Sequence, residues 1–161
     1  FSTEGATQDR LAIFAKRGWV LTQPDGSPRP WLDPAVPEVR AYLDAAVREL
    51  AVKYATHGVH LDFVRYPDFA SSLGPTVKTR FERATGRRAA DWPEDVKSGP
   101  LRQLFIRWRA EQVSDFVQTA RKTVRRGAPG KPPGPNSATS FCFRLSPPGF
   151  SEARLPESMR G

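Results

Sequence analysis

The chain has 161 residues, a net charge of +8 and a sequence pI near 10.2. This length is enough for one domain with a hydrophobic core. No apolar run reaches the roughly 20 residues of a membrane-spanning helix, and the first residues, FSTEGATQDR, lack the pattern of a signal peptide. The single cysteine, Cys142, excludes an internal disulfide and forms no zinc-ligand pattern with the two histidines. We therefore expect no metal and no other cofactor.

The first elements predicted are a short helix and a turn. Residues 8–17 place Leu11, Phe14 and Ala15 on one helical face. Two apolar stretches then flank residues 24–27, whose sequence PDGS is typical of a tight turn. We interpret residues 19–32 as a small hairpin or loop outside the core, because the prolines that follow the turn cannot donate to a ladder.

A longer helix is predicted to begin at Pro37, whose missing N–H costs nothing at the first helical position, and to run to about Tyr54. Two acid-before-base pairs four residues apart, Asp44–Arg48 and Glu49–Lys53, support it on the solvent side. Its apolar residues recur at the helical spacing and form one stripe: Val39, Tyr42, Leu43, Ala46, Val47, Leu50 and Tyr54.

The period changes to two after this helix, in the segment GVHLDFVRYPD from Gly58 to Asp68. One set of alternating side chains is apolar (Val59, Leu61 and Phe63), and the other set consists of His60, Asp62 and Val64. A helix followed at once by such a strand predicts an α/β fold with a parallel sheet.

The later elements are mainly helical. A short helix through Val77, Phe81 and Ala84 is closed by Gly86, residues 91–95 form a loop or a helix start, and a long helix runs from Pro100 to about Val124. From residue 127 onward the sequence is rich in Pro and Gly and has no period. We therefore divide the chain into an α/β region over residues 1–126 and an irregular, disordered or frame-shifted tail over 127–161.

Asp62 is the candidate catalytic residue, because inward-facing side chains at the carboxyl ends of barrel strands form active sites. The alternative is an Asp that bonds to a loop or pairs with Arg65. A carboxylate in this position can act as nucleophile or general base, and glycoside hydrolysis uses two carboxyl groups about 5–9 Å apart.

Five further residues are candidate substrate-binding residues. His60 shares the predicted face of Asp62 and can bond to a substrate, hold a metal or pack in the core. Tyr66 can stack on a sugar ring or simply pack, and Asp68 is a candidate second acid or a solvated loop residue. Arg65 follows the carboxylate closely, and Trp31, next to loop prolines, is a candidate platform for a sugar ring.

Three stretches of the chain, WLDPAVPEVR (31–40), GVHLDFVRYP (58–67) and WRAEQV (108–113), resemble the family-10 glycosyl-hydrolase-like domain. The resemblance covers about residues 10–126 and implies a (β/α)₈ barrel, of which this chain would hold an incomplete fragment with parallel strands, since a full barrel needs roughly 250 residues. It also implies an exported or envelope-associated glycan hydrolase with Asp62 on the fourth strand. Amylase-like barrels often carry Arg two residues before this Asp, whereas this chain has His60.

The expected partner is a polysaccharide or a peptidoglycan-type glycan, with no nucleic acid and no membrane span. One alternative is a catalytically silent, carbohydrate-binding relative. Another is a basic module that binds nucleic acid through Arg121 to Lys131, a stretch that includes the basic cluster Arg121, Lys122, Arg125 and Arg126. We expect the chain to be inactive alone, because it would carry one carboxylate of the catalytic pair.

Overall fold

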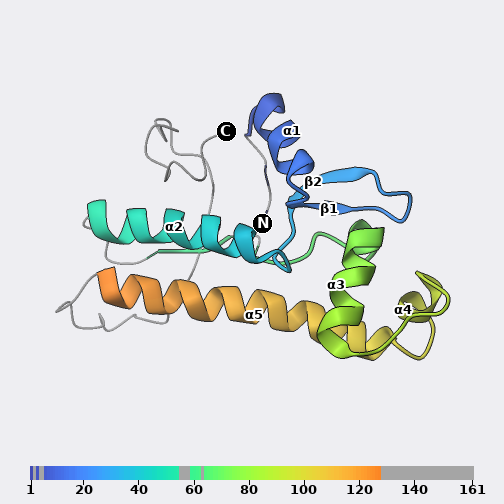
Figure 1. Cartoon of the computed structure of the whole chain (residues 1–161). Coiled ribbons are helices and arrows are strands. Elements are labelled where there is room, and N and C mark those ends of the chain that lie inside the picture. The colour runs from blue at the N-terminus through green and yellow to red at the C-terminus, as the bar shows by residue number, and fades with distance from the viewer. Residues whose placement is uncertain (2, 4–5, 55–58, 63, 128–161) are drawn as a thin grey trace.

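The computed structural model describes residues 1, 3, 6–54, 59–62 and 64–127 (Figure 1). In this part of the chain the two long helices lie side by side, and the last two short helices lie near the start of the longest one. The elements are α1 Gln8–Lys16, β1 Val20–Thr22, β2 Pro28–Leu32, α2 Pro37–Lys53, the 3₁₀ turn η1 Ala70–Ser72, α3 Pro75–Thr85, α4 Glu94–Lys97 and α5 Arg102–Gly127.

The helix α2 confirms the prediction from apolar spacing. It begins at Pro37 and buries Val39, Leu43, Ala46, Val47 and Ala51. Both predicted ion pairs form, with 3.7 Å between Arg48 and Asp44 and 2.8 Å between Lys53 and Glu49. Tyr54, however, is 54% exposed, so its predicted place in the apolar stripe is wrong.

The predicted hairpin forms as an antiparallel pair in which Val20 lies opposite Leu32. Its predicted place outside the core is wrong, because Val20, Leu21 and Leu32 are all buried. Pro30 lacks a donor, but its carbonyl accepts a hydrogen bond from the Thr3 N–H (3.2 Å). The Leu32 N–H donates to the Phe1 carbonyl (2.9 Å), so Phe1 and Thr3 cover the second edge of β2.

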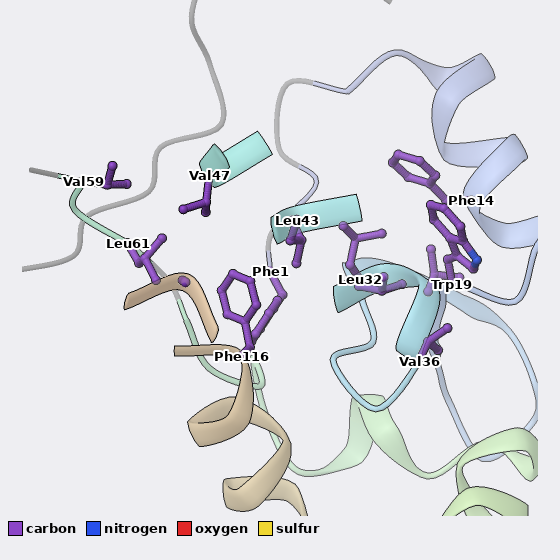
Figure 2. Packing of buried hydrophobic residues seen from close by; sticks show 13 residues of the cluster. Phe1, Phe14, Trp19, Leu32, Val36, Leu43, Val47, Val59, Leu61 and Phe116 are labelled. Carbon is purple, nitrogen blue, oxygen red and sulfur yellow. The ribbon is translucent and has the colours of Figure 1, made fainter. Parts of the chain in front are cut away.

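Two apolar clusters form the core, and α5 contributes to both. The first cluster lies between α1, the hairpin, α2 and the middle of α5 (Figure 2), and Phe116 meets Phe1 there at a ring-centroid distance of 5.4 Å. The second cluster gathers where α3 and α4 meet the start of α5, and its buried residues are Leu73, Val77, Phe81, Val96, Phe105 and Trp108. The 26-residue α5 therefore joins two packing centres that are distant in sequence.

The remaining helix predictions are confirmed with shifted ends. Gly86 closes α3 in the left-handed conformation (φ 68°), which glycine adopts without steric cost. The long helix begins at Arg102 instead of Pro100 and extends to Gly127. The predicted tail from residue 128 onward lies outside the described residues, as do His57, Gly58 and Phe63.

The parallel sheet expected from the α/β pattern is not found in the described part of the chain, whose one sheet is the antiparallel pair of β1 and β2. The predicted strand over 58–68 is therefore wrong for the residues that can be described there. A strand is defined by its ladder, and no described segment pairs with residues 59–62 in one. The fold shown is a mixed arrangement of helices with one small sheet.

Candidate functional site

The 59–64 segment keeps the predicted alternation of burial over its first four residues. Val59 and Leu61 are buried in the first apolar cluster, whereas His60 is exposed and Asp62 is half-buried. Val64 packs against the same cluster, so its predicted orientation with His60 and Asp62 is wrong. The core thus anchors one side of this segment and leaves the imidazole and the carboxylate on the other.

Asp62 and Arg65 both lie within electrostatic reach of the Phe1 α-amino group. Burial lowers the pKa of this amine from 8.0 to about 6, the Asp62 carboxylate opposes the shift, and the Arg65 guanidinium adds to it. Arg65 itself is exposed, and it donates a long hydrogen bond (3.4 Å) to the Pro67 carbonyl. The Phe1 amine is therefore close enough to the candidate catalytic carboxylate to interact with it electrostatically.

Tyr66 is held in the interior, under an arginine of α5. The guanidinium carbon of Arg109 lies 4.1 Å from the centroid of the Tyr66 ring, a cation–π arrangement. Burial raises the pKa of the Tyr66 phenol well above its usual range, and the nearby charge of Asp33 adds to the shift. The phenol is therefore neutral at physiological pH, and Arg109 occupies one face of the ring that was expected to meet a sugar.

Asp68 fixes the turn that follows. Its carboxylate accepts a hydrogen bond from the Ser71 N–H (2.6 Å) and lies 4.0 Å from the Arg29 guanidinium. Its backbone carbonyl accepts a hydrogen bond from Arg109 Nη2 (2.7 Å). Arg109 thus brings Tyr66 and Asp68 together, while Trp31 packs from β2 against the first apolar cluster.

Sequence reasoning missed the most deeply buried charge of the region, Asp33, which is 1% exposed. Its carboxylate pairs with Arg80 of α3 (2.7 Å) and accepts a hydrogen bond from the Ala35 N–H (2.9 Å). Burial raises the pKa of Asp33, and both the Ala35 N–H and the Arg80 guanidinium oppose this shift. In the sequence, Asp33 was used only as part of the WLDPAVPEVR stretch that carries the resemblance, although a carboxylate shortly before a helix N-terminus could have signalled a buried pair.

Arg109 was likewise missed as a functional candidate. It is 8% exposed, and burial lowers the pKa of its guanidinium, whereas electrostatic interactions with Tyr66, Asp68 and Asp33 oppose the shift. The signal was its position one residue after Trp108, on the apolar side of a helix, where an arginine needs buried partners.

The four basic residues proposed for nucleic-acid binding are exposed on the last turns of α5. Beside them an open groove of about 400 Å³ separates α2 from α5 and carries charges of both signs, and its lining residues are Arg40, Ala41, Asp44, Asp115, Gln118, Thr119 and Lys122. Within the described residues, no group of three or more His, Cys, Asp or Glu side chains is arranged to hold a metal. None of the helices in that part of the chain has the length and apolar character of a membrane span.

Comparison with known proteins places this arrangement in a class. A family model described as "Glycosyl hydrolase-like 10" matches residues 5–132, which include the Asp33, Asp62 and Arg109 positions. The protein is therefore of the glycosyl hydrolase-like class, as the resemblance predicted. In particular, the chain belongs to the glycosyl hydrolase-like 10 family.

One curated relative is an S-layer-related protein of Niallia circulans, 27% identical over 128 residues. The alignment covers 73% of this chain but only 7% of the relative. No solved structure matches the chain.

Replacement of Asp33 by Ala should lower the free energy of unfolding by about 3 kcal/mol, because it leaves the partly buried Arg80 guanidinium, 2.7 Å from the carboxylate, without its counter-charge. The matched control is Glu94→Ala. Glu94 also lies 2.7 Å from its partner, Lys97, but both side chains are about half exposed, so a loss below about 1 kcal/mol is expected. Urea unfolding measures both values, and equal losses would show that the burial of Asp33 has no energetic consequence.

The Phe1 amine should make stability depend on pH. Its folded pKa of about 6 lies below the unfolded value of 8.0, so between these values the unfolded chain binds more protons than the folded chain. The free energy of unfolding should therefore rise with pH across this window, by up to about 2–3 kcal/mol. A chain acetylated at Phe1 has no amine to titrate and should lack this rise. Identical pH profiles for the two chains would contradict the burial of the amine.

Proposed function

We propose that this chain carries the Asp62 half of the active site of a glycoside hydrolase, and that Asp62 contacts the sugar next to the scissile bond. The observation that carries the proposal is the alternation in the 59–64 segment, where the core holds Val59 and Leu61 while His60 and Asp62 remain outside it. Membership of the glycosyl hydrolase-like 10 family supplies the class of reaction.

In this proposal Asp62 acts as the nucleophile or as the general base, and His60 bonds to a sugar hydroxyl. Glycoside hydrolysis needs a second carboxyl group about 5–9.5 Å away, which protonates the leaving oxygen. Asp68 is poorly suited to that role, because its carboxylate already accepts the Ser71 N–H and lies near Arg29. We therefore expect the partner acid to lie outside residues 60–68.

The expected substrate is a polysaccharide, with peptidoglycan-type glycan chains as the first candidate. The name of the Niallia circulans relative refers to the S-layer, and this favours a glycan of the cell envelope and an exported parent protein. Because that alignment covers only 7% of the relative, we take from it no reaction and no residue role.

The experiment compares the wild-type chain with Asp62→Asn and Glu111→Gln in co-sedimentation with purified peptidoglycan. Wild type should bind and release no reducing ends, because one carboxylate of the pair is insufficient for cleavage. Asp62→Asn should weaken binding about tenfold or more, as expected for the loss of a hydrogen bond to a charged group. Glu111 is exposed on α5, and its substitution changes the net charge equally without touching the 59–64 segment.

Equal binding by the two variants would remove Asp62 from the site. If wild type does not bind any glycan, the proposed function is wrong for this chain. Reducing ends released by wild type but not by Asp62→Asn would instead show that the chain is catalytic alone. Binding that survives Asp62→Asn in every glycan tested would favour the catalytically silent alternative.

A further inference from the structure

The loop that follows the candidate site, residues 66–73, gathers the buried polar atoms that lack a hydrogen-bond partner. Among the described residues these atoms are Thr22 Oγ1, Arg29 Nε, Tyr66 Oη, Ser71 Oγ, Ser72 Oγ and Arg109 Nε. Three of them belong to the loop. The other three belong to side chains whose residues contact it, since Arg29 and Arg109 reach Asp68 and the Thr22 carbonyl accepts the Leu73 N–H (3.2 Å).

A buried polar atom without a partner disfavours the conformation that buries it. The hydrogen bond from the Ser71 N–H to the Asp68 carboxylate therefore does not by itself account for the shape of the 66–73 loop, and contacts from outside must compensate. Backbone strain or unmet polar groups maintained by the surrounding structure are a recurrent property of functional sites. A residue outside the 66–73 loop must therefore hold it in place.

One end of the loop is fixed by the hairpin and by a tryptophan. The Leu73 carbonyl accepts a hydrogen bond from Trp92 Nε1 (2.7 Å), and the Gly74 N–H donates to the Thr22 carbonyl (3.0 Å). Gly74 has no room for a side chain, because a Cβ there would collide with the Thr22 side chain. This end of the loop is therefore closely packed independently of the contacts at the other end.

Arg109 holds the other end, which is the end nearer to Asp62. Its Nη2 donates to the Asp68 carbonyl (2.7 Å), and its guanidinium carbon lies 4.1 Å from the Tyr66 ring centroid and 5.3 Å from that of Phe69. A planar guanidinium can stack on a ring and donate in its own plane at the same time, whereas a lysine ammonium cannot. Since one side chain contacts three residues of the loop, its loss should release the loop as a unit.

The position of Arg109 is fixed independently of the loop. Its neighbours on α5, Phe105 and Trp108, are buried in the second apolar cluster, where their rings lie 5.7 Å apart. The buried Asp33 carboxylate also acts on the Arg109 guanidinium as an opposite charge. Helix α5 thus holds Arg109, and Arg109 holds the loop.

We propose that Arg109 is a positioning residue of the glycan site: through Tyr66, Asp68 and Phe69 it orients the chain that leaves Asp62. This rests on the proposed function of Asp62. The residue touches no substrate in the proposal, and its effect on glycan binding passes through the loop.

The test measures amide hydrogen exchange and peptidoglycan binding of the 161-residue chain for wild type, Arg109→Lys and Arg107→Lys. In Arg109→Lys the Ser71 amide, which donates to the Asp68 carboxylate, should exchange about tenfold faster or more, while buried amides of α2 such as Leu43 keep their protection. Peptidoglycan binding should weaken with it. Arg107 is exposed on the same helix, and its substitution should change neither measurement.

A second pair of variants probes the same contact from the loop. Tyr66→Leu removes the ring on which Arg109 stacks and should reproduce the faster Ser71 exchange. Tyr66→Phe removes only the unpartnered hydroxyl and should keep wild-type exchange, because the ring remains. This pair of Tyr66 variants tests whether the Arg109–Tyr66 contact holds the loop, even if Arg109→Lys fails to fold.

Unchanged Ser71 exchange in both Arg109→Lys and Tyr66→Leu would overturn the proposal. Equal loss of protection in the loop and in α2 would also overturn it, because such a loss indicates that Arg109 has a purely structural role. Faster loop exchange with unchanged peptidoglycan binding would overturn the positioning role and leave the proposed function intact. Absence of binding by wild type would instead overturn the proposed function, and the exchange data would still show whether Arg109 holds the loop.

Discussion

The arrangement of this protein depends on an ion pair whose carboxylate is buried, the 2.7 Å contact between Asp33 and Arg80. Asp33 stands between the hairpin and α2, and Arg80 stands on α3, so the pair joins the two apolar clusters at their boundary. Arg80 also donates to the Gly18 carbonyl (3.3 Å), which links α3 to the turn before β1. The removal of the Asp33 carboxylate from water is costly, and the cost is offset here by the Arg80 guanidinium and by the hydrogen bond from the Ala35 N–H.

From this pair a chain of contacts leads to the candidate site. Arg109 receives electrostatic compensation from Asp33 and structural support from α5, and it then stacks on Tyr66 and holds the Asp68 carbonyl. Tyr66 lies four residues after Asp62, so the loop that Arg109 holds is the direct continuation of the segment that carries the carboxylate. The buried charge of Arg109 is thus separate from the outward-facing side chains of His60 and Asp62. The buried guanidinium fixes the loop that continues the segment carrying those two side chains.

The helices could be predicted from sequence because their signals are local. Apolar spacing and Pro37 were sufficient for α2, and Gly86 was sufficient for the end of α3. The burial of the hairpin could not be predicted, because it depends on hydrogen bonds that join Phe1 and Thr3 to the outer edge of β2. The prolines of β2 have no backbone N–H, so there was no reason in the sequence to expect pairing along that edge. The outward position of His60 could be predicted from the period of two. The strand pairing expected for residues 58–68 could not, because pairing depends on which segments lie beside it in the fold. The buried roles of Asp33 and Arg109 were missed because each side chain reaches its partners only in the folded chain.

The most direct test of this account is a map of amide chemical-shift changes when a soluble peptidoglycan oligosaccharide is titrated into the labelled chain. The account predicts that the largest changes fall on residues 60–62 and 64–68, with smaller changes at Arg109 and none in α4. Changes centred on the groove between α2 and α5, or on the four basic residues at the end of α5, would contradict it. In that case the family's glycan chemistry would have to be sought on another surface of this chain.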